Sequence, residues 1–247
     1  MNNQVTICRD AEHLYRVAAA QFVTLARAAA QAAGRFTVAL SGGSTPKSLY
    51  TLLATPEYRQ QMPWSRIHLF WGDERCVPPD HPESNYRMVQ ETLLTRINIP
   101  QRNVHRMAGE KNPEIAAAEY EQELSNFFQL SEGGTPCFDL ILLGLGEDGH
   151  TASLFPGSEA VEDMKHLVTT VYVEKLGSHR LTLTLPVLNN GAQIVFLVSG
   201  RNKAHVLREI LGANSVSSTL PAARVQPVNG RLTWLVTQDA AAGLQVK

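Results

Sequence analysis

The chain has 247 residues, of which 44% are hydrophobic, and its formal net charge at pH 7 is −1. This length suits one large α/β domain or two small ones, with an ample apolar core, and we predict a single domain over residues 1–247. The near-neutral charge provides no basic surface for nucleic acid and no polybasic segment for an anionic membrane. We therefore expect neither of these partners, and we expect anionic ligands to be held by local groups.

The N-terminal residues and the cysteines bear on the cellular location. The chain begins without an apolar signal segment, and it contains no run of about 18 consecutive apolar residues. Cys8, Cys76 and Cys137 are few, odd in number and widely spaced, which is not typical of a disulfide framework or a zinc site. These features predict a cytoplasmic protein with reduced cysteines.

Hydrophobic periodicity predicts alternating helices and strands. A long amphipathic helix is expected from Asp10 to Ala33, with Asp10 as its cap and Gly34 at its end. Residues 131–136 and 212–218 are expected to be surface loops. The remaining strands are predicted at 36–40, 67–71, 139–143, 167–173, 180–185, 194–198 and 232–236, and the remaining helices at 46–54, 84–95, 113–130 and 202–211. This alternation predicts an α/β fold with a largely parallel sheet covered on both faces.

A glycine-rich loop, SGGSTPK, follows the predicted strand at 36–40 and opens the next helix. The two glycines permit close approach of a ligand, while hydroxyls and free N–H groups at a helix N-terminus favour an anion such as phosphate. Pro46 stands where a nucleotide P-loop requires a glycine, so ATP is not the expected ligand. The alternative is a tight strand–helix turn. The candidate phosphate-binding residues are Gly42, Gly43, Ser44 and Thr45.

An acid and an imidazole follow the apolar run at 139–143. Ligands of parallel sheets bind beyond the carboxyl ends of the strands, which places Asp148 and His150 where an active site is expected. An acid two residues from a histidine can orient the ring and stabilise the imidazolium, as a general base near neutral pH requires. The pair suggests proton transfer. The alternative is a purely structural pair in which Asp148 caps the turn.

The stretch GLGEDG at 144–149 also fits the dinucleotide-binding pattern GxGxxG after a strand. Two features oppose that interpretation. Glu147 and Asp148 place carboxylates where a pyrophosphate would have to bind, and the Pro-Gly pair at 156–157 truncates the helix that should receive it. We therefore predict no nicotinamide cofactor.

Three adjacent charges follow the predicted strand at 67–71, in the stretch WGDERCVPP. Arg75 can bind a carboxylate, a phosphate or a developing oxyanion, and Asp73 can accept hydrogen bonds from sugar hydroxyls or support the site. The alternative is a local ion pair on the surface. A metal site made of Asp73, Glu74 and His81 lacks a recognisable ligand spacing, so we predict no metal.

Two further cations stand near predicted strands. Arg180 opens the stretch RLTLTLP, and Lys203 follows the strand at 194–198. Lys203 is expected in the first turn of a helix, where its charge opposes the helix dipole unless a bound anion offsets both. This arrangement points to phosphate, although each cation taken singly is typical of a solvated surface residue.

Together these stretches resemble the 6-phosphogluconolactonase family. The matching stretches, in the order of that family, are SGGSTP at 41–46, WGDERCVPPDHPESNYRM at 71–88, LGLGEDGHTASLFPG at 143–157, HRLTLTLPVLNNG at 179–191 and SGRNKA at 199–204. The resemblance implies a three-layer αβα sandwich related to glucosamine-6-phosphate deaminase. It also implies hydrolysis of 6-phospho-D-glucono-1,5-lactone in the oxidative pentose phosphate pathway, without a metal or an organic cofactor.

The same resemblance implies roles for the candidate residues. His150 is the expected general base that activates water, Asp148 and Asp73 support the polar site, and Arg75 contacts the substrate or the oxyanion. Whether Asp148 or Asp73 orients His150 is left open. The expected phosphate pocket consists of Gly42, Gly43, Ser44, Thr45, Arg180 and Lys203, with the lactone end as the alternative position for Arg180.

Two other functions are alternatives. A sugar-phosphate isomerase such as glucosamine-6-phosphate deaminase resembles the chain at the glycine loop and the Asp-Gly-His turn. That family has an acid five residues beyond the histidine, where this chain has Phe155. A non-catalytic sugar-phosphate-binding regulator usually needs a DNA-binding module, and the sequence contains neither a spare domain nor a basic helix. The sequence makes no prediction of the oligomeric state.

Overall fold

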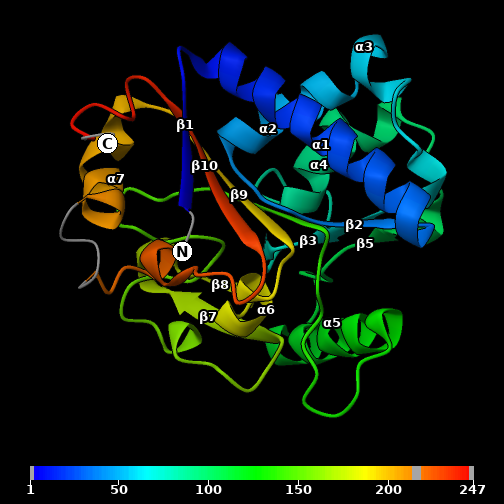
Figure 1. Cartoon of the computed structure of the whole chain (residues 1–247). Coiled ribbons are helices and arrows are strands. Elements are labelled where there is room, and N and C mark those ends of the chain that lie inside the picture. Colours follow the sequence, from blue (N-terminus) through cyan, green and yellow to red (C-terminus); the bar gives the residue numbers. More distant parts are fainter. Residues whose placement is uncertain (1–2, 213–217, 245–247) are drawn as a thin grey trace.

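The computed structural model describes residues 3–212 and 218–244 (Figure 1). The strands of the central sheet are β1 (Asn3–Cys8), β2 (Phe36–Leu40), β3 (Ile67–Trp71), β5 (Val104–His105), β6 (Leu140–Leu143), β9 (Gln193–Val198) and β10 (Arg231–Thr237). They lie in the order β1-β10-β9-β6-β2-β3-β5, and every neighbouring pair is parallel. All residues of β2 and β6 are buried, which explains why their sequences are continuous apolar runs without alternation.

Helices cover both faces of this sheet. Figure 1 shows α1, α2 and α4 on one side, and α5 with α6 on the other. As predicted, Asp10 caps the N-terminus of α1: its carboxylate accepts from the His13 N–H at 2.8 Å. Gly34 caps the C-terminus in a left-handed conformation, with φ 76°. The predicted αβα sandwich is confirmed. The helices are α1 (Ala11–Ala33), α2 (Ser44–Leu53), α3 (Pro56–Arg59), α4 (Asn85–Thr92), α5 (Pro113–Phe128), α6 (Leu185–Asn189) and α7 (Ala204–Leu211).

A second, three-stranded antiparallel sheet lies beside the predicted parallel sheet. It consists of β4 (Asp73–Arg75), β8 (Ser178–Leu183) and β7 (Val168–Val173), in the order β4-β8-β7. The predicted strands at 167–173 and 180–185 therefore form an antiparallel hairpin. Only a short turn ending at the left-handed Gly177 separates β7 from β8, whereas a parallel connection needs a crossover of about a dozen residues.

Three strands were absent from the prediction. They are β1, β4 and β5, and the last two contain only three and two residues. Such short strands carry too little periodicity to be recognised in a sequence. Of the loop predicted at 212–218, residues 213–217 lie outside the described part of the chain. No helix among the described residues combines the length and the apolar character needed to cross a membrane.

The topology brings three loops to one edge of the central sheet. Strands β9, β6 and β2 are neighbours and run in the same direction, so the loops after their carboxyl ends lie side by side. The small sheet joins this edge through Gly72, whose N–H donates to the Leu40 carbonyl and whose carbonyl accepts from the Leu183 N–H, both at 2.8 Å. The charged residues of β4 and β8 are thereby placed beside the same loops.

Candidate active site

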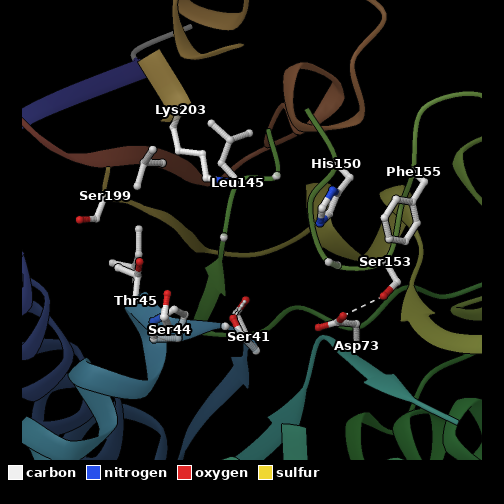
Figure 2. Close-up of a pocket in the computed structure, with 18 of the residues that line it drawn as sticks. Ser41, Ser44, Thr45, Asp73, Leu145, His150, Ser153, Phe155, Ser199 and Lys203 are labelled. Atoms are coloured by element: carbon white, nitrogen blue, oxygen red, sulfur yellow. Dashed lines mark hydrogen bonds between the residues drawn. The ribbon is translucent and has the colours of Figure 1, made fainter. Parts of the chain in front are cut away.

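A cavity of about 400 Å³ lies at this edge of the sheet (Figure 2). Residues from the loops after β2, β6 and β9 line it, together with residues of β4 and β8. The predicted site residues in its lining are Gly42, Gly43, Ser44, Thr45, Asp73, Arg75, His150, Arg180 and Lys203. Asp148 is the remaining predicted residue, and it reaches the cavity through its contact with His150.

Asp148 is the carboxylate that contacts His150. Its Oδ1 lies 2.5 Å from His150 Nδ1, and the same oxygen accepts from the His150 backbone N–H at 3.2 Å. Partial burial acts to raise the pKa of Asp148, but the hydrogen bonds and the charge of His150 outweigh it and hold this pKa below its ordinary value. An ionised Asp148 fixes the ring with Nε2 as the nitrogen left for chemistry.

Gly146 makes this pairing possible. A Cβ atom at Gly146 would lie 2.0 Å from His150 Nδ1 and 2.6 Å from Asp148 Oδ1, so a side chain here would collide with both. The turn closes through the Gly146 N–H, which donates to the His150 carbonyl at 2.8 Å. The glycine pattern that resembles a dinucleotide fingerprint therefore accommodates an acid–histidine pair. Sequence reasoning missed Gly146 as a site residue, although its pattern was visible.

Phe155 covers one face of the His150 ring. The two ring centroids are 4.5 Å apart, with an interplanar angle of 33°. Phe155 also lines the cavity, five residues beyond His150. An apolar ring cannot transfer a proton, so this position serves to pack the histidine.

Asp73 is held away from His150 by other partners. Its Oδ2 accepts from Ser153 Oγ at 2.8 Å, as Figure 2 shows, and its Oδ1 lies 3.3 Å from the donating Nδ2 of Asn85. The Ser153 N–H donates in turn to Thr182 Oγ1 at 3.2 Å. Asp73 thus connects β4 to the turn that carries His150. Ser153 was also missed, because nothing in the sequence pairs it with a residue 80 positions away.

Ala152 adopts a strained backbone conformation in this turn, with φ 48°. For a residue with a Cβ, left-handed geometry costs about 1–2 kcal/mol, and glycine avoids that cost at the expense of roughly 0.4–1 kcal/mol of additional unfolded-state entropy. We therefore expect Ala152→Gly to raise the free energy of unfolding by about 0.5–1 kcal/mol. Chemical denaturation measures this change.

The control is Ala28→Gly, on the exposed face of α1. Glycine inside a regular helix destabilises by about 1 kcal/mol, so this variant should be less stable than the parent protein. A loss of stability in both variants would contradict strain at Ala152.

Two arginines face each other across the small sheet. Arg75 in β4 and Arg180 in β8 are register partners, and both line the cavity. Like charges directly opposite in a sheet repel, and burial together with the charge of Arg75 lowers the pKa of Arg180. Neither Nε has a hydrogen-bond partner among the described residues, whereas Arg75 Nη1 donates to the Glu83 carbonyl. Both arginines line the cavity, so the pair presents positive charge to an anion there.

The glycine loop and Lys203 lie at the other end of the cavity. Figure 2 shows Ser44, Thr45 and Lys203 away from the end that holds His150 and Asp73. The first helical residue of α2 is Ser44, and the N-cap residue before it, Gly43, has no side chain that could cap this N-terminus. Its N–H groups are therefore available to an anion.

Lys203 belongs to a short 3₁₀ turn, Arg201–Lys203, directly before α7. Its Nζ lies 4.0 Å from Glu147 Oε1, and the same oxygen accepts from Asn202 Nδ2 at 2.6 Å. Glu147 is therefore a loose counter-ion for Lys203 and leaves the ammonium available for a ligand. Within the described ranges, no group of three or more His, Cys, Asp and Glu residues is arranged to hold a metal ion.

Comparison with known proteins identifies one family. The model of the family described as glucosamine-6-phosphate isomerases/6-phosphogluconolactonase matches residues 9–234. A protein of Synechocystis sp. named 6-phosphogluconolactonase is 48% identical over 213 residues, which cover 86% of each chain. A protein of Nostoc sp. with the same name is 44% identical over 214 residues, covering 86% of this chain and 85% of the relative.

Solved structures agree with this assignment. The 6-phosphogluconolactonase of Trypanosoma brucei superposes with a TM-score of 0.87 at 27% identity, covering 98% of this chain and 99% of the other. That of Thermotoga maritima gives 0.82 at 31% identity, with 96% and 100% covered. A monomeric glucosamine-6-phosphate deaminase shares the fold, with a TM-score of 0.81 at 21% identity and coverage of 97% and 99%. The chain belongs to the glucosamine-6-phosphate isomerase/6-phosphogluconolactonase family.

Proposed function

We propose that the protein hydrolyses 6-phospho-D-glucono-1,5-lactone to 6-phospho-D-gluconate, a step of the oxidative pentose phosphate pathway. The observation that carries this proposal is the pairing of His150 with Asp148 in a cavity whose other end holds an uncapped helix N-terminus and Lys203. Such a cavity suits a substrate with a hydrolysable carbonyl at one end and a phosphate at the other. The names of the curated relatives support the same activity.

His150 acts as the general base in this mechanism. Because Asp148 occupies Nδ1, the Nε2 atom accepts a proton from water as the water oxygen attacks the lactone carbonyl. Asp148 stabilises the imidazolium that forms. The imidazolium then returns the proton to the ring oxygen as the carbon–oxygen bond breaks, which yields the acid and a free hydroxyl. A lactone is an activated ester, so the mechanism uses no covalent enzyme intermediate.

Arg75 and Arg180 supply positive charge where negative charge develops. Attack on the carbonyl produces a tetrahedral oxyanion and then a carboxylate, and preorganised donors stabilise both. The repulsion between the two guanidinium groups, which an anion would offset, favours an anion in this position. We place Arg180 at the lactone end on this basis, and assign the phosphate to Lys203 and to Gly42, Gly43, Ser44 and Thr45.

A coupled assay tests the proposed function directly. The phosphorylated lactone is generated in place, and release of acid is followed with and without the protein. An enzyme should increase the rate above spontaneous hydrolysis in proportion to its concentration. A rate that stays at the spontaneous value would contradict the proposal.

The cytoplasmic location, the single domain over 1–247 and the absence of a metal, an organic cofactor and nucleic acid stay predictions.

Lys203→Ala is expected to lower kcat/KM for the phosphorylated lactone by about ten- to a hundredfold. The lysine is assigned to the phosphate, which is remote from the reacting carbonyl, so its loss removes one charge-assisted contact of roughly 1.5–3 kcal/mol and raises mainly KM. Steady-state kinetics with the parent protein and the variant measure this change.

Unphosphorylated glucono-1,5-lactone is the matched control, because it offers nothing for the lysine to bind. Its kcat/KM should be nearly the same for both proteins. Equal losses on the two substrates would place Lys203 outside the phosphate pocket.

A further inference from the structure

Asn85 contacts a residue at each end of the cavity, although the mechanism above gives it no role. It is the first residue of α4, and only 2% of it is exposed. The sequence stretch that contains it, SNYRM, belongs to the family resemblance but carries none of the predicted site residues. A buried asparagine beside an active site calls for an account of where its amide hydrogen bonds go.

Glu74 fixes the position of the Asn85 backbone through hydrogen bonds. Because side chains alternate along a strand, Glu74 points away from the cavity-lining residues that flank it in β4. Its buried carboxylate accepts from the backbone N–H groups of Asn85 and Tyr86, each at 2.7 Å, and from Ser84 Oγ at 3.2 Å. A carboxylate at a helix N-terminus satisfies free donors and complements the helix dipole. The start of α4 is thereby anchored to β4.

The side chain of Asn85 contacts both Asp73 and the glycine loop. Its Nδ2 donates to the Asp73 carbonyl at 2.9 Å and approaches Asp73 Oδ1 at 3.3 Å. Its Oδ1 lies against Gly42, where a Cβ atom would come within 2.1 Å of it. The backbone of Gly42 is not left-handed, so the close approach of Asn85 is what requires a glycine there.

We propose that Asn85 is a positioning residue that holds Asp73 and the glycine loop at a set separation. Asp73 belongs to the reacting end of the cavity and Gly42 to the phosphate-binding end, so one buried amide determines how a substrate that spans both is aligned. Glu74 acts through Asn85 by fixing the start of α4. This inference rests on the proposed function, because it assumes a substrate bound at both ends.

Asn85→Asp is the first test, because it keeps the shape of the side chain and replaces the donor with a second carboxyl group. The introduced carboxyl group and that of Asp73 are too close for both to ionise readily, and the buried Glu74 adds to the repulsion. The cationic Arg75 and Arg180, which line the same cavity, oppose this repulsion. When the introduced carboxyl group is protonated, it again offers a donor toward Asp73. The variant should therefore lose about tenfold in kcat near pH 8 and recover relative to the parent protein as the pH falls toward 6.

Asn103→Asp is the matched control for this test. Asn103 is equally buried, and its Nδ2 also donates to main-chain carbonyls, but these belong to Ser65 and Ile67, neither of which lines the cavity. The control should lose stability yet keep the kcat and the pH profile of the parent protein. An Asn85→Asp variant with unchanged kcat, or with a loss that does not vary with pH, would overturn the positioning role.

A second test uses the contact between Asn85 and Gly42. Gly42→Ala alone should displace the amide and lower both kcat and the melting temperature. In an Asn85→Ala background the space is vacant, so the same Gly42→Ala change should cost much less. A double-mutant cycle measures this non-additivity. Losses that simply add, in stability as well as in kcat, would overturn the proposed contact.

Two measurements, the rate of lactone hydrolysis and the stability of the variants in the double-mutant cycle, separate this inference from the proposed function. If the parent protein fails to accelerate hydrolysis of the phosphorylated lactone, the proposed function is wrong, and the stability cycle still decides whether Asn85 and Gly42 are coupled. If the parent protein is active but both cycles are additive, the function stands and the role of Asn85 is wrong.

Discussion

His150→Ala is expected to lower kcat/KM for the phosphorylated lactone by about 10²- to 10⁴-fold, which is the usual contribution of a general base. The variant removes the nitrogen that accepts the proton of water, while the Arg75–Arg180 pair and the phosphate pocket remain. His150 is about one-third exposed, with 32% of its side chain accessible, so the fold should tolerate its truncation. Steady-state kinetics on a variant with an unchanged circular dichroism spectrum measure the loss.

The pH dependence of the parent protein provides the control. A general base must be neutral to accept a proton, so kcat/KM should fall as the assay pH is lowered from about 8 to about 5. Asp148, whose pKa is held below its ordinary value, stays ionised there and does not contribute a second limb. If the acid limb persists unchanged in His150→Ala, a different group is responsible for it.

Gly146→Ala is expected to lower kcat by about 10²-fold, because the new Cβ atom would lie 2.0 Å from His150 Nδ1. The imidazole must move, or the turn must shift, and either change takes Nε2 away from the attacking water. The backbone of Gly146 is not left-handed, so alanine introduces a steric conflict without additional backbone strain. Binding should suffer less than kcat, because the phosphate pocket lies at the other end of the cavity.

Gly144→Ala is the matched control on the same loop. A Cβ atom there would have Ser41 Oγ as its nearest neighbour, at 3.7 Å, which is an ordinary van der Waals contact. This variant should retain most of the kcat of the parent protein. Equal losses at both glycines would show that the loop tolerates no side chain at all, and that the specific contact with His150 is not the cause.

The sequence by itself determined the features that depend on neighbouring residues. The helix α1 begins at the Asp10 cap and ends before Gly34 because both signals act within one turn. That Asp148 lies near His150 was predictable for the same reason, since the two residues are separated by a single glycine. The continuous apolar runs of β2 and β6 likewise predicted strands buried on both faces, with ligand-binding loops at their carboxyl ends.

Only the tertiary structure decided which distant residues meet. The sequence left open whether Asp148 or Asp73 orients His150. In the structure the carboxylate of Asp148 contacts His150, whereas that of Asp73 is hydrogen-bonded to Ser153 and Asn85. The pairing of β4 with β8, two strands far apart in the sequence, places Arg75 opposite Arg180. The runs at 167–173 and 180–185 predicted strands but not their antiparallel pairing, because pairing is decided by contacts within the folded chain. Hydrophobic periodicity indicates which residues are buried, but it does not indicate which distant segment packs against them.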